Sequence, residues 1–172
     1  MARYNDNLAV LFADITDSTK LYGSLGDNAA RVVVNACLTI VGDVVARCRG
    51  RIVKTIGDEA MCVFRRADDA VAAAIEIQST IDSKRPGKYH VQMHIGLHYG
   101  PVLVEDSDVY GDTVNAAAYL TAVAAAEQVL TTEATERNLS PELKSSVRPV
   151  FKSVLKGSTE ESTVYQVVWH KD

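Results

Sequence analysis

LAVLFADITDST, residues 8–19, decides the fold, because here an apolar run ends in an acid and is followed by residues that favour a helix start. The run from Leu8 to Asp14 has the length of a buried strand. The short polar side chains of TDST are typical of helix N-termini. The segment therefore predicts a strand, a tight turn and a helix.

The segments that follow alternate between helical and extended patterns. Apolar residues recur at helical spacing from Asp27 to Arg49 and stop at a glycine, which predicts a long helix. RIVKTI (51–56) and EAMCVF (59–64) flank a Gly-Asp pair and predict a hairpin. ADDAVAAAIEIQSTIDSK (67–84) opens with acids and ends in a lysine, so its charges favour a helix.

An alternating pattern from Tyr89 to Tyr99 predicts a half-buried strand with an apolar and a polar face. The apolar face would hold Val91, Met93, Ile95 and Leu97, and the polar face His90, Gln92, His94 and His98. Beyond this strand we expect a turn near Gly111, a helix from about Thr113, a strand at QVLTT, a short helix capped by Thr132 and two final strands ending at YQVVW.

This order of elements predicts an α+β fold. It is typical of a ferredoxin-like α/β sandwich, with helices on one side of a mostly antiparallel sheet. The 172 residues are 47% apolar and 23% charged and show no repeat or linker. We therefore expect a single domain over residues 1–172, which could be a piece of a longer protein.

Composition also limits the function. A net charge of −4 and a pI near 5.6 argue against a nucleic-acid partner, which would call for a basic surface. No run approaches the eighteen or so apolar residues of a membrane span, and the start lacks the pattern of a signal peptide. Cys37, Cys48 and Cys62 have no metal-ligand spacing and are expected to be reduced core residues. We therefore expect a cytoplasmic protein with no membrane segment in this chain.

Two acids stand where predicted strands end. Asp14 closes the first strand, and Asp58 lies in the turn of the hairpin. If the two strands are neighbours, the carboxylates converge and offer hard oxygen ligands that suit Mg²⁺ or Mn²⁺. Two such ions can activate a hydroxyl and stabilise a leaving phosphate. One aspartate taken alone more often caps a turn or a helix.

Four segments, LFADITDST, KTIGDEAM, IGLHYGPV and DVYGDTVNAAAYL, occur in an order and spacing that resemble the class III adenylate and guanylate cyclase family. The resemblance runs from Leu8 to about Val168. It implies that Asp14 and Asp58 bind two divalent cations, Mg²⁺ or Mn²⁺, and that the carbonyl group of Ile15 is a further ligand.

The resemblance also assigns residues to the nucleotide. Lys54 and Asp108 fall where the family reads the purine base. A lysine donates to N1 of adenine and an aspartate accepts from its exocyclic amine, whereas guanine presents the reverse pattern, so the pair favours ATP. Guanylate cyclases typically carry Glu and Cys there. Asn115 resembles the asparagine that orients the ribose, and Lys156 the lysine that binds the triphosphate.

The activity implied is the conversion of ATP to 3′,5′-cyclic AMP and pyrophosphate, by in-line attack of the ribose 3′-hydroxyl on the α-phosphorus. The family takes its metal aspartates from one protomer and its purine-reading residues from the other. This chain holds both sets, so the resemblance implies a symmetric homodimer. It also implies a role in signal transduction, with a fused or separate regulatory domain.

One position departs from the family pattern. Four residues after Asn115 the family places an arginine that meets the developing charge, and this chain has Tyr119. Tyrosine brings no cation, and such arginines contribute about a thousandfold or more to the rate. The chain is thus either an adenylate cyclase, slowed or rescued by another cation such as Arg148, or a catalytically degenerate cyclase-like domain that binds nucleotide or mediates dimerisation. A ferredoxin-like domain without nucleotide would require the four motif matches to be coincidental.

The repeated histidines are not expected to share an ion. On the predicted strand His90, His94 and His98 spread over roughly 26 Å at about 3.3 Å per residue. We expect them to form a polar sheet face or a dimer surface.

Overall fold

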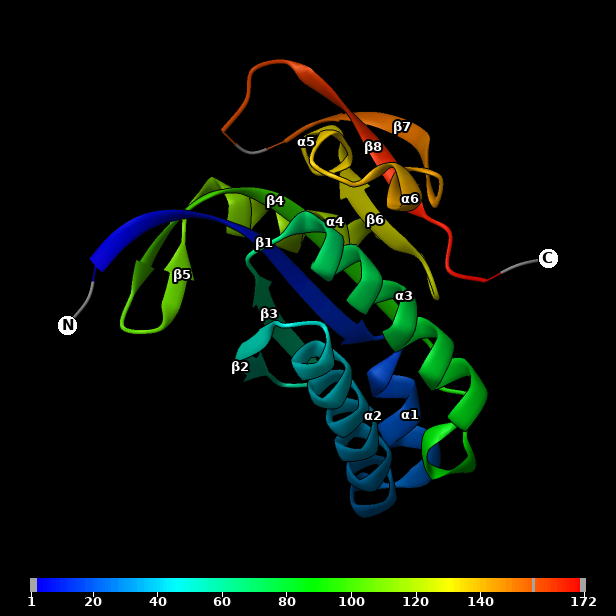
Figure 1. Cartoon of the computed structure of the whole chain (residues 1–172). Helices are drawn as coiled ribbons and strands as arrows, with labels where there is room; N and C mark the ends of the chain where they lie inside the picture. The colour runs from blue at the N-terminus through cyan, green and yellow to red at the C-terminus, as the bar shows by residue number, and fades with distance from the viewer. Residues whose placement is uncertain (1–2, 156, 171–172) are drawn as a thin grey trace.

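The computed structural model describes residues 3–155 and 157–170, and an eight-stranded sheet runs through them (Figure 1). The strands lie in the order β2-β3-β1-β4-β6-β8-β7, with β5 paired to β4. Among the described strands, only β4 and β6 pair in parallel. The bounds are β1 Arg3–Ile15, β2 Arg51–Ile56, β3 Glu59–Phe64, β4 Met93–Glu105, β5 Asp108–Tyr110, β6 Val129–Thr132, β7 Val147–Val154 and β8 Glu161–Val167. The sheet is mostly antiparallel, as the sequence predicts.

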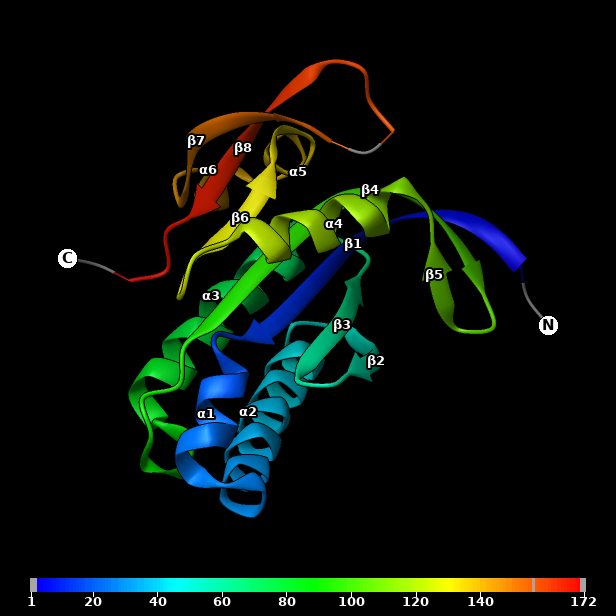
Figure 2. The same cartoon turned by 180° about the vertical axis from the view of Figure 1, so that it is seen from behind.

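Helices cover both faces of this sheet. The first three helices lie together on one face, and α4 crosses the other (Figure 2). The bounds are α1 Ser18–Leu25, α2 Asp27–Arg47, α3 Ala67–Lys84, α4 Asp112–Val123, α5 Glu133–Arg137 and α6 Pro141–Lys144, with a 3₁₀ turn, η1, at Pro86–Lys88. The expectation that helices occupy one side is therefore wrong for α4.

A glycine explains how α4 reaches the second face. A Cβ atom built on Gly96 of β4 would stand 2.7 Å from the backbone oxygen of Ala117 in α4. No side chain fits that gap, so glycine lets the helix backbone approach the strand closely. The sequence pattern does not reveal on which face of the sheet a helix packs when its close approach depends on a single glycine.

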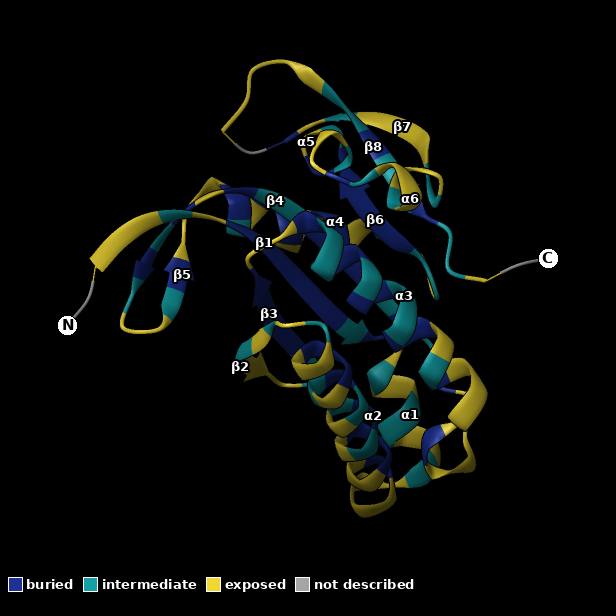
Figure 3. Cartoon of the chain, in the orientation of Figure 1, coloured by how far each residue is buried: buried dark blue, intermediate teal, exposed yellow. Residues whose placement is uncertain are grey.

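From Leu8 onward strand β1 is buried on both faces, which accounts for its unbroken apolar run. Ala9 and Leu11 belong to the larger core under α2 and α3. Leu8, Val10 and Phe12 belong to a smaller core that also includes residues of α4. Figure 3 shows β1 buried along the middle of the sheet. Each of its large side chains contributes roughly 1.5–3 kcal/mol when fully buried.

Helix α2 is long and apolar enough to cross a membrane by length and composition alone, with a mean hydropathy of 1.7 in its most apolar window. In this fold it is an amphipathic core helix, because one stripe of its side chains packs under the sheet. That stripe consists of Ala30, Val33, Val34, Cys37, Val41, Val44 and Val45. Burial raises the pKa of the Cys37 thiol to about 12, so this cysteine is an inert core residue.

The predicted boundaries hold for α3 and the hairpin but not for β4. Helix α3 covers residues 67–84, as expected. Strand β4 begins at Met93 rather than Tyr89 and continues to Glu105. Pro101 lies within this strand, opposite Asn7 of β1. On the other edge of β4, the pairing with β6 covers Ile95 and Gly96 and does not extend to Pro101. Proline is tolerated there because no second neighbour needs its missing N–H group.

His98 of β4 is held neutral by its surroundings. Burial lowers its pKa to about 4. Its Nδ1 atom lies 2.7 Å from the hydroxyl oxygen of Thr132. That oxygen accepts a hydrogen bond from the Thr135 amide at 3.2 Å and so caps α5, as the sequence predicts. The Thr132 hydroxyl can then donate its proton to a neutral imidazole.

The depressed pKa of His98 predicts that stability falls as the pH falls from about 6.5 to about 4. The unfolded chain binds the proton more tightly than the folded one, so acid favours unfolding, by on the order of 3 kcal/mol when the pH is below both values. Urea unfolding between pH 7.5 and 4.5 should show a steeper loss of stability for the parent protein than for His98→Gln. Equal pH slopes would contradict the assignment.

Candidate active site

The two predicted metal-binding acids lie at the same end of neighbouring strands. Asp14 stands near the end of β1, directly opposite Glu59 of β3. Asp58 immediately precedes Glu59, in the turn between β2 and β3. The condition set by the sequence, that the two strands be neighbours, is met. Carboxylates gathered in this way fit the oxygen ligands that Mg²⁺ and Mn²⁺ prefer.

Asp14, Asp58 and Glu59, which we call the acid cluster, stand at the end of β1 and the start of β3. Burial raises the pKa of the Glu59 carboxyl, and repulsion by Asp14 raises it further. One oxygen of Asp14 accepts a hydrogen bond from the amide of Ile15 at 3.0 Å. The Ile15 side chain itself is buried, which fixes the backbone that follows Asp14. A divalent cation would relieve the repulsion between these carboxylates.

A histidine that the sequence analysis did not assign to the site contacts Asp14. The Nε2 atom of His94 lies 3.3 Å from Asp14 Oδ2, and its Nδ1 atom lies 2.8 Å from the hydroxyl of Thr16. If the Thr16 hydroxyl donates to Nδ1, the imidazole proton sits on Nε2 and points at the carboxylate. Thr16 and His94 thus orient Asp14.

The spacing of residues along one strand does not reveal the role of His94. His94 lies opposite Asp14 in the register between β4 and β1, and only the pairing of the two strands reveals that contact. His90, by contrast, lies before the start of β4. It does not share a strand face with His94 and His98, so that part of the expectation is wrong.

The predicted purine-reading residues also meet. Lys54 of β2 donates a hydrogen bond from Nζ to Asp108 Oδ2 at the start of β5, over 2.9 Å. This hydrogen bond lowers the pKa of the Asp108 carboxyl and raises that of the Lys54 ammonium group. Tyr110, exposed beside them, has a raised pKa because of the charge on Asp108. A donor and an acceptor thus stand side by side at the surface.

Both groups belong to the sheet face that carries α4. Asp14 is two residues beyond Phe12, so the two side chains point the same way. Lys54 lies opposite Met61, and cross-strand partners share a face. Phe12 and Met61 both belong to the smaller core on the α4 side. The acid cluster and the Lys54–Asp108 pair therefore open on one face.

Helix α4 presents the remaining predicted residues. Asn115 and Tyr119 are exposed one turn apart on the same side of α4. The Tyr119 hydroxyl lies 3.0 Å from the Ser153 hydroxyl of β7. Arg148 is five residues earlier on β7, roughly 16 Å along the strand, so it does not stand beside Tyr119 in the same chain. Lys156 lies outside the described residues.

An apolar surface adjoins this helix. It consists of Tyr119 and Val123 of α4 and Val150, Phe151 and Val154 of β7, each at least 40% exposed. The contact between Tyr119 and Ser153 joins the two elements. Exposed apolar side chains on adjoining elements are candidates for an interaction surface, and we refer to these five residues as the α4–β7 surface.

The sequence matches a known family along nearly its whole length. Residues 1–168 match the family model described as adenylate and guanylate cyclase catalytic domain. The chain is 36% identical over 123 residues to an adenylate cyclase of Streptomyces coelicolor and 34% identical over 121 residues to one of Streptomyces griseus. These alignments cover 72% and 70% of this chain and 32% and 30% of the relatives. The chain therefore spans about a third of the length of these relatives.

Solved structures share the fold. The adenylyl cyclase CyaB from P. aeruginosa is similar with a TM-score of 0.84 and 22% identity, over 99% of this chain and 98% of that one. The catalytic core of a rhodopsin-guanylyl cyclase with converted specificity, in complex with ATPalphaS, gives a TM-score of 0.88 at 23% identity, over 97% and 98% of the two chains. The arrangement of sheet and helices is that of the catalytic domains of class III cyclases.

The contact between His94 and Asp14 predicts that His94→Ala binds Mn²⁺ about tenfold or more weakly, because the loss of an outer partner costs about 10–100-fold in metal affinity. Calorimetric titration of the nucleotide-free protein with Mn²⁺ measures this change. His94→Gln, which keeps an N–H donor, should recover part of the affinity. An unchanged dissociation constant for His94→Ala would rule out a positioning role.

Proposed function

Because the chain belongs to the family of adenylate and guanylate cyclase catalytic domains, we propose that it is an adenylate cyclase that converts ATP to 3′,5′-cyclic AMP and pyrophosphate. The single observation that carries this choice of substrate is the 2.9 Å contact between Lys54 and Asp108. N1 of adenine accepts a hydrogen bond and the neighbouring amine donates one. Lys54 and Asp108 offer the matching donor and acceptor side by side.

Asp14 and Asp58 would hold two divalent cations, Mg²⁺ or Mn²⁺, together with the carbonyl group of Ile15. Such ions, when bound, activate the ribose 3′-hydroxyl and neutralise the charge on the phosphates. His94 keeps the Asp14 carboxylate turned toward the site. Asn115 would orient the ribose, and Lys156 would bind the triphosphate. The contribution of the chain is thus mainly position and charge.

We propose that the active unit is a homodimer with two shared sites. Each site would combine Asp14 and Asp58 of one protomer with Lys54 and Asp108 of its partner. Two features support this arrangement. The face that bears both groups is crossed by α4 alone among the longer helices, and the α4–β7 surface leaves large apolar side chains exposed.

The wider setting is also a proposal. Residues 1–172 would act as one catalytic unit in the cytoplasm, where ATP is available, and would serve signal transduction. The matched relatives are about three times as long as the aligned segment, which supports control by a regulatory domain, fused or separate.

The shared site predicts complementation between inactive variants. Asp14→Ala and Lys54→Ala should each make no cyclic AMP from ATP and Mn²⁺. Their mixture should recover about a quarter of the parent rate, because half the dimers are mixed and each mixed dimer has one intact site. Cyclic nucleotide formation from ATP and from GTP measures both activity and base preference.

A matched control separates the two halves of the site. Asp14→Ala mixed with Asp58→Ala should stay inactive, since both variants damage the same half. Preference for GTP in the parent protein would refute the substrate assignment. An inactive mixture of Asp14→Ala and Lys54→Ala, with subunit exchange demonstrated, would refute the shared site.

One observation favours a second candidate function, a degenerate cyclase-like domain that binds nucleotide or mediates dimerisation. Tyr119 supplies no cation where the family pattern has arginine, and its hydroxyl contacts Ser153 of β7. In such a domain Tyr119 would link α4 to β7 and would take no part in charge stabilisation.

Tyr119→Arg distinguishes the two candidates. In an aligned site the guanidinium would meet the phosphate with paired donors and raise kcat by at least tenfold, up to about a thousandfold, with little change in KM. Tyr119→Lys should gain less, because it lacks the planar fork. No gain in a protein that is already active would indicate a substitute cation. No gain in an inactive one would indicate the degenerate domain.

A further inference from the structure

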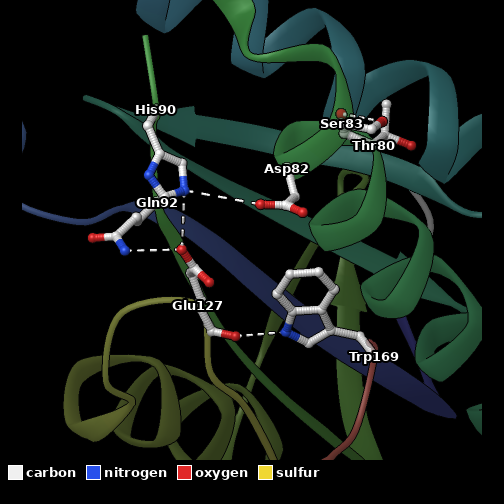
Figure 4. A network of polar contacts seen from close by, with 7 residues as sticks. All are labelled: Thr80, Asp82, Ser83, His90, Gln92, Glu127 and Trp169. Atoms are coloured by element: carbon white, nitrogen blue, oxygen red, sulfur yellow. Dashed lines mark hydrogen bonds and ion pairs between the residues drawn. The ribbon is translucent and has the colours of Figure 1, made fainter. Parts of the chain in front are cut away.

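A second group of ligating side chains lies outside the candidate active site. Asp82 comes from the last turn of α3, His90 from the segment before β4, and Glu127 from the turn between α4 and β6. One ligand atom from each lies within 4.8 Å of the other two. Figure 4 shows the two carboxylates approaching the same imidazole nitrogen.

The distances suit a small cation. His90 Nε2 lies 3.3 Å from Glu127 Oε1 and 3.8 Å from Asp82 Oδ1. Ligands about 2.1 Å from a tetrahedral ion stand about 3.4 Å apart. Small side-chain movements would therefore bring the three atoms to an ion. The carboxylate oxygens of Asp82 and Glu127 lie within 4.8 Å of each other, and two carboxylates this close repel each other unless a positive charge lies between them.

The ligand types indicate which class of ion binds. An imidazole nitrogen with two carboxylate oxygens suits zinc and other divalent transition metals, whereas Mg²⁺ and Ca²⁺ prefer oxygen alone. The predicted catalytic ligands, Asp14 and Asp58, offer oxygen. The chain thus presents two chemically different cation environments.

Glu127 is held in place by its neighbours. Its backbone has a φ of 65°, a left-handed conformation that costs a non-glycine residue roughly 1–2 kcal/mol. Its amide donates to the carbonyl oxygen of Met93 at 2.8 Å, and its own carbonyl oxygen accepts from the Trp169 indole at 2.7 Å. Gln92 donates to Glu127 Oε1 at 2.8 Å. These contacts fix the carboxylate beside His90, as outer-shell partners of metal ligands do.

We propose that Asp82, His90 and Glu127 form a binding site for a divalent transition metal, with Zn²⁺ as the best match. Asp82 and His90 are exposed, so water would complete the coordination and the ion would exchange with solvent. Binding would link α3, the segment before β4 and the turn after α4. The site does not depend on the proposed cyclase activity.

Calorimetric titration with ZnCl₂ tests the site in a protein that carries Asp14→Ala and Asp58→Ala, which removes the predicted catalytic ligands. The expected result is one bound zinc ion and a melting temperature that rises with zinc concentration. Adding His90→Ala should weaken zinc binding at least about tenfold and abolish the rise. Asp82→Asn, which preserves the shape of the side chain, should also weaken binding.

His170→Ala is the matched control, because His170 is an exposed imidazole next to Trp169 and outside the three ligands. Zinc affinity should be unchanged in this variant, and excess Mg²⁺ should not displace the ion. The proposal is overturned if the background protein binds no zinc, or if His90→Ala and Asp82→Asn, both folded by circular dichroism, bind it as tightly as the background protein. The proposal is also overturned if zinc binding is lost in His170→Ala but kept in His90→Ala and Asp82→Asn.

Discussion

The pairing of β1 with β3 on one side and β4 on the other is the constraint on which the rest of the molecule depends. Because β1 is buried on both faces from Leu8 onward, a slip of one residue would move its side chains from one core to the other and turn Asp14 toward the core under α2 and α3. The register instead places Asp14 between Glu59 and His94. Hydrophobic packing along the strand thus fixes the position of charged groups at its end.

The two predicted halves of the site differ in charge balance. Lys54 and Asp108 neutralise each other in the free chain and can exchange that contact for hydrogen bonds to a base. In the acid cluster, burial and then the charge of Asp14 raise the pKa of Glu59, and His94 partly offsets this effect. The Lys54–Asp108 half is therefore neutral without a ligand, whereas the acid cluster would gain stability from a bound cation.

Periodicity and turn residues predicted most elements, including residues 67–84 of α3, because these signals are local. Pairing is not local. The sequence could say that Asp14 and Asp58 end strands, but their proximity depends on β1 lying beside β3, and His94 was missed because its partner lies on another strand. The alternating polar and apolar residues before Met93 predicted a strand, although residues 90–92 precede β4. The sequence does not reveal that Gly96 contacts α4, because this contact depends on where the helix packs in the fold.

Helix α4 shows how stability and chemistry compete at one element. Close packing on Gly96 sets the distance between α4 and the sheet. On the exposed side of the helix, Tyr119 contacts Ser153 of β7. A hydroxyl pair of this kind contributes about 1 kcal/mol to the folded monomer, whereas a cation at the same position would act on charge that develops in a reaction. A module that only dimerised would gain from Tyr119 and lose from the clustered acids, since unbalanced carboxylates destabilise a fold. In the proposed cyclase these acids would hold the metal ions, a role that a dimerisation module does not require.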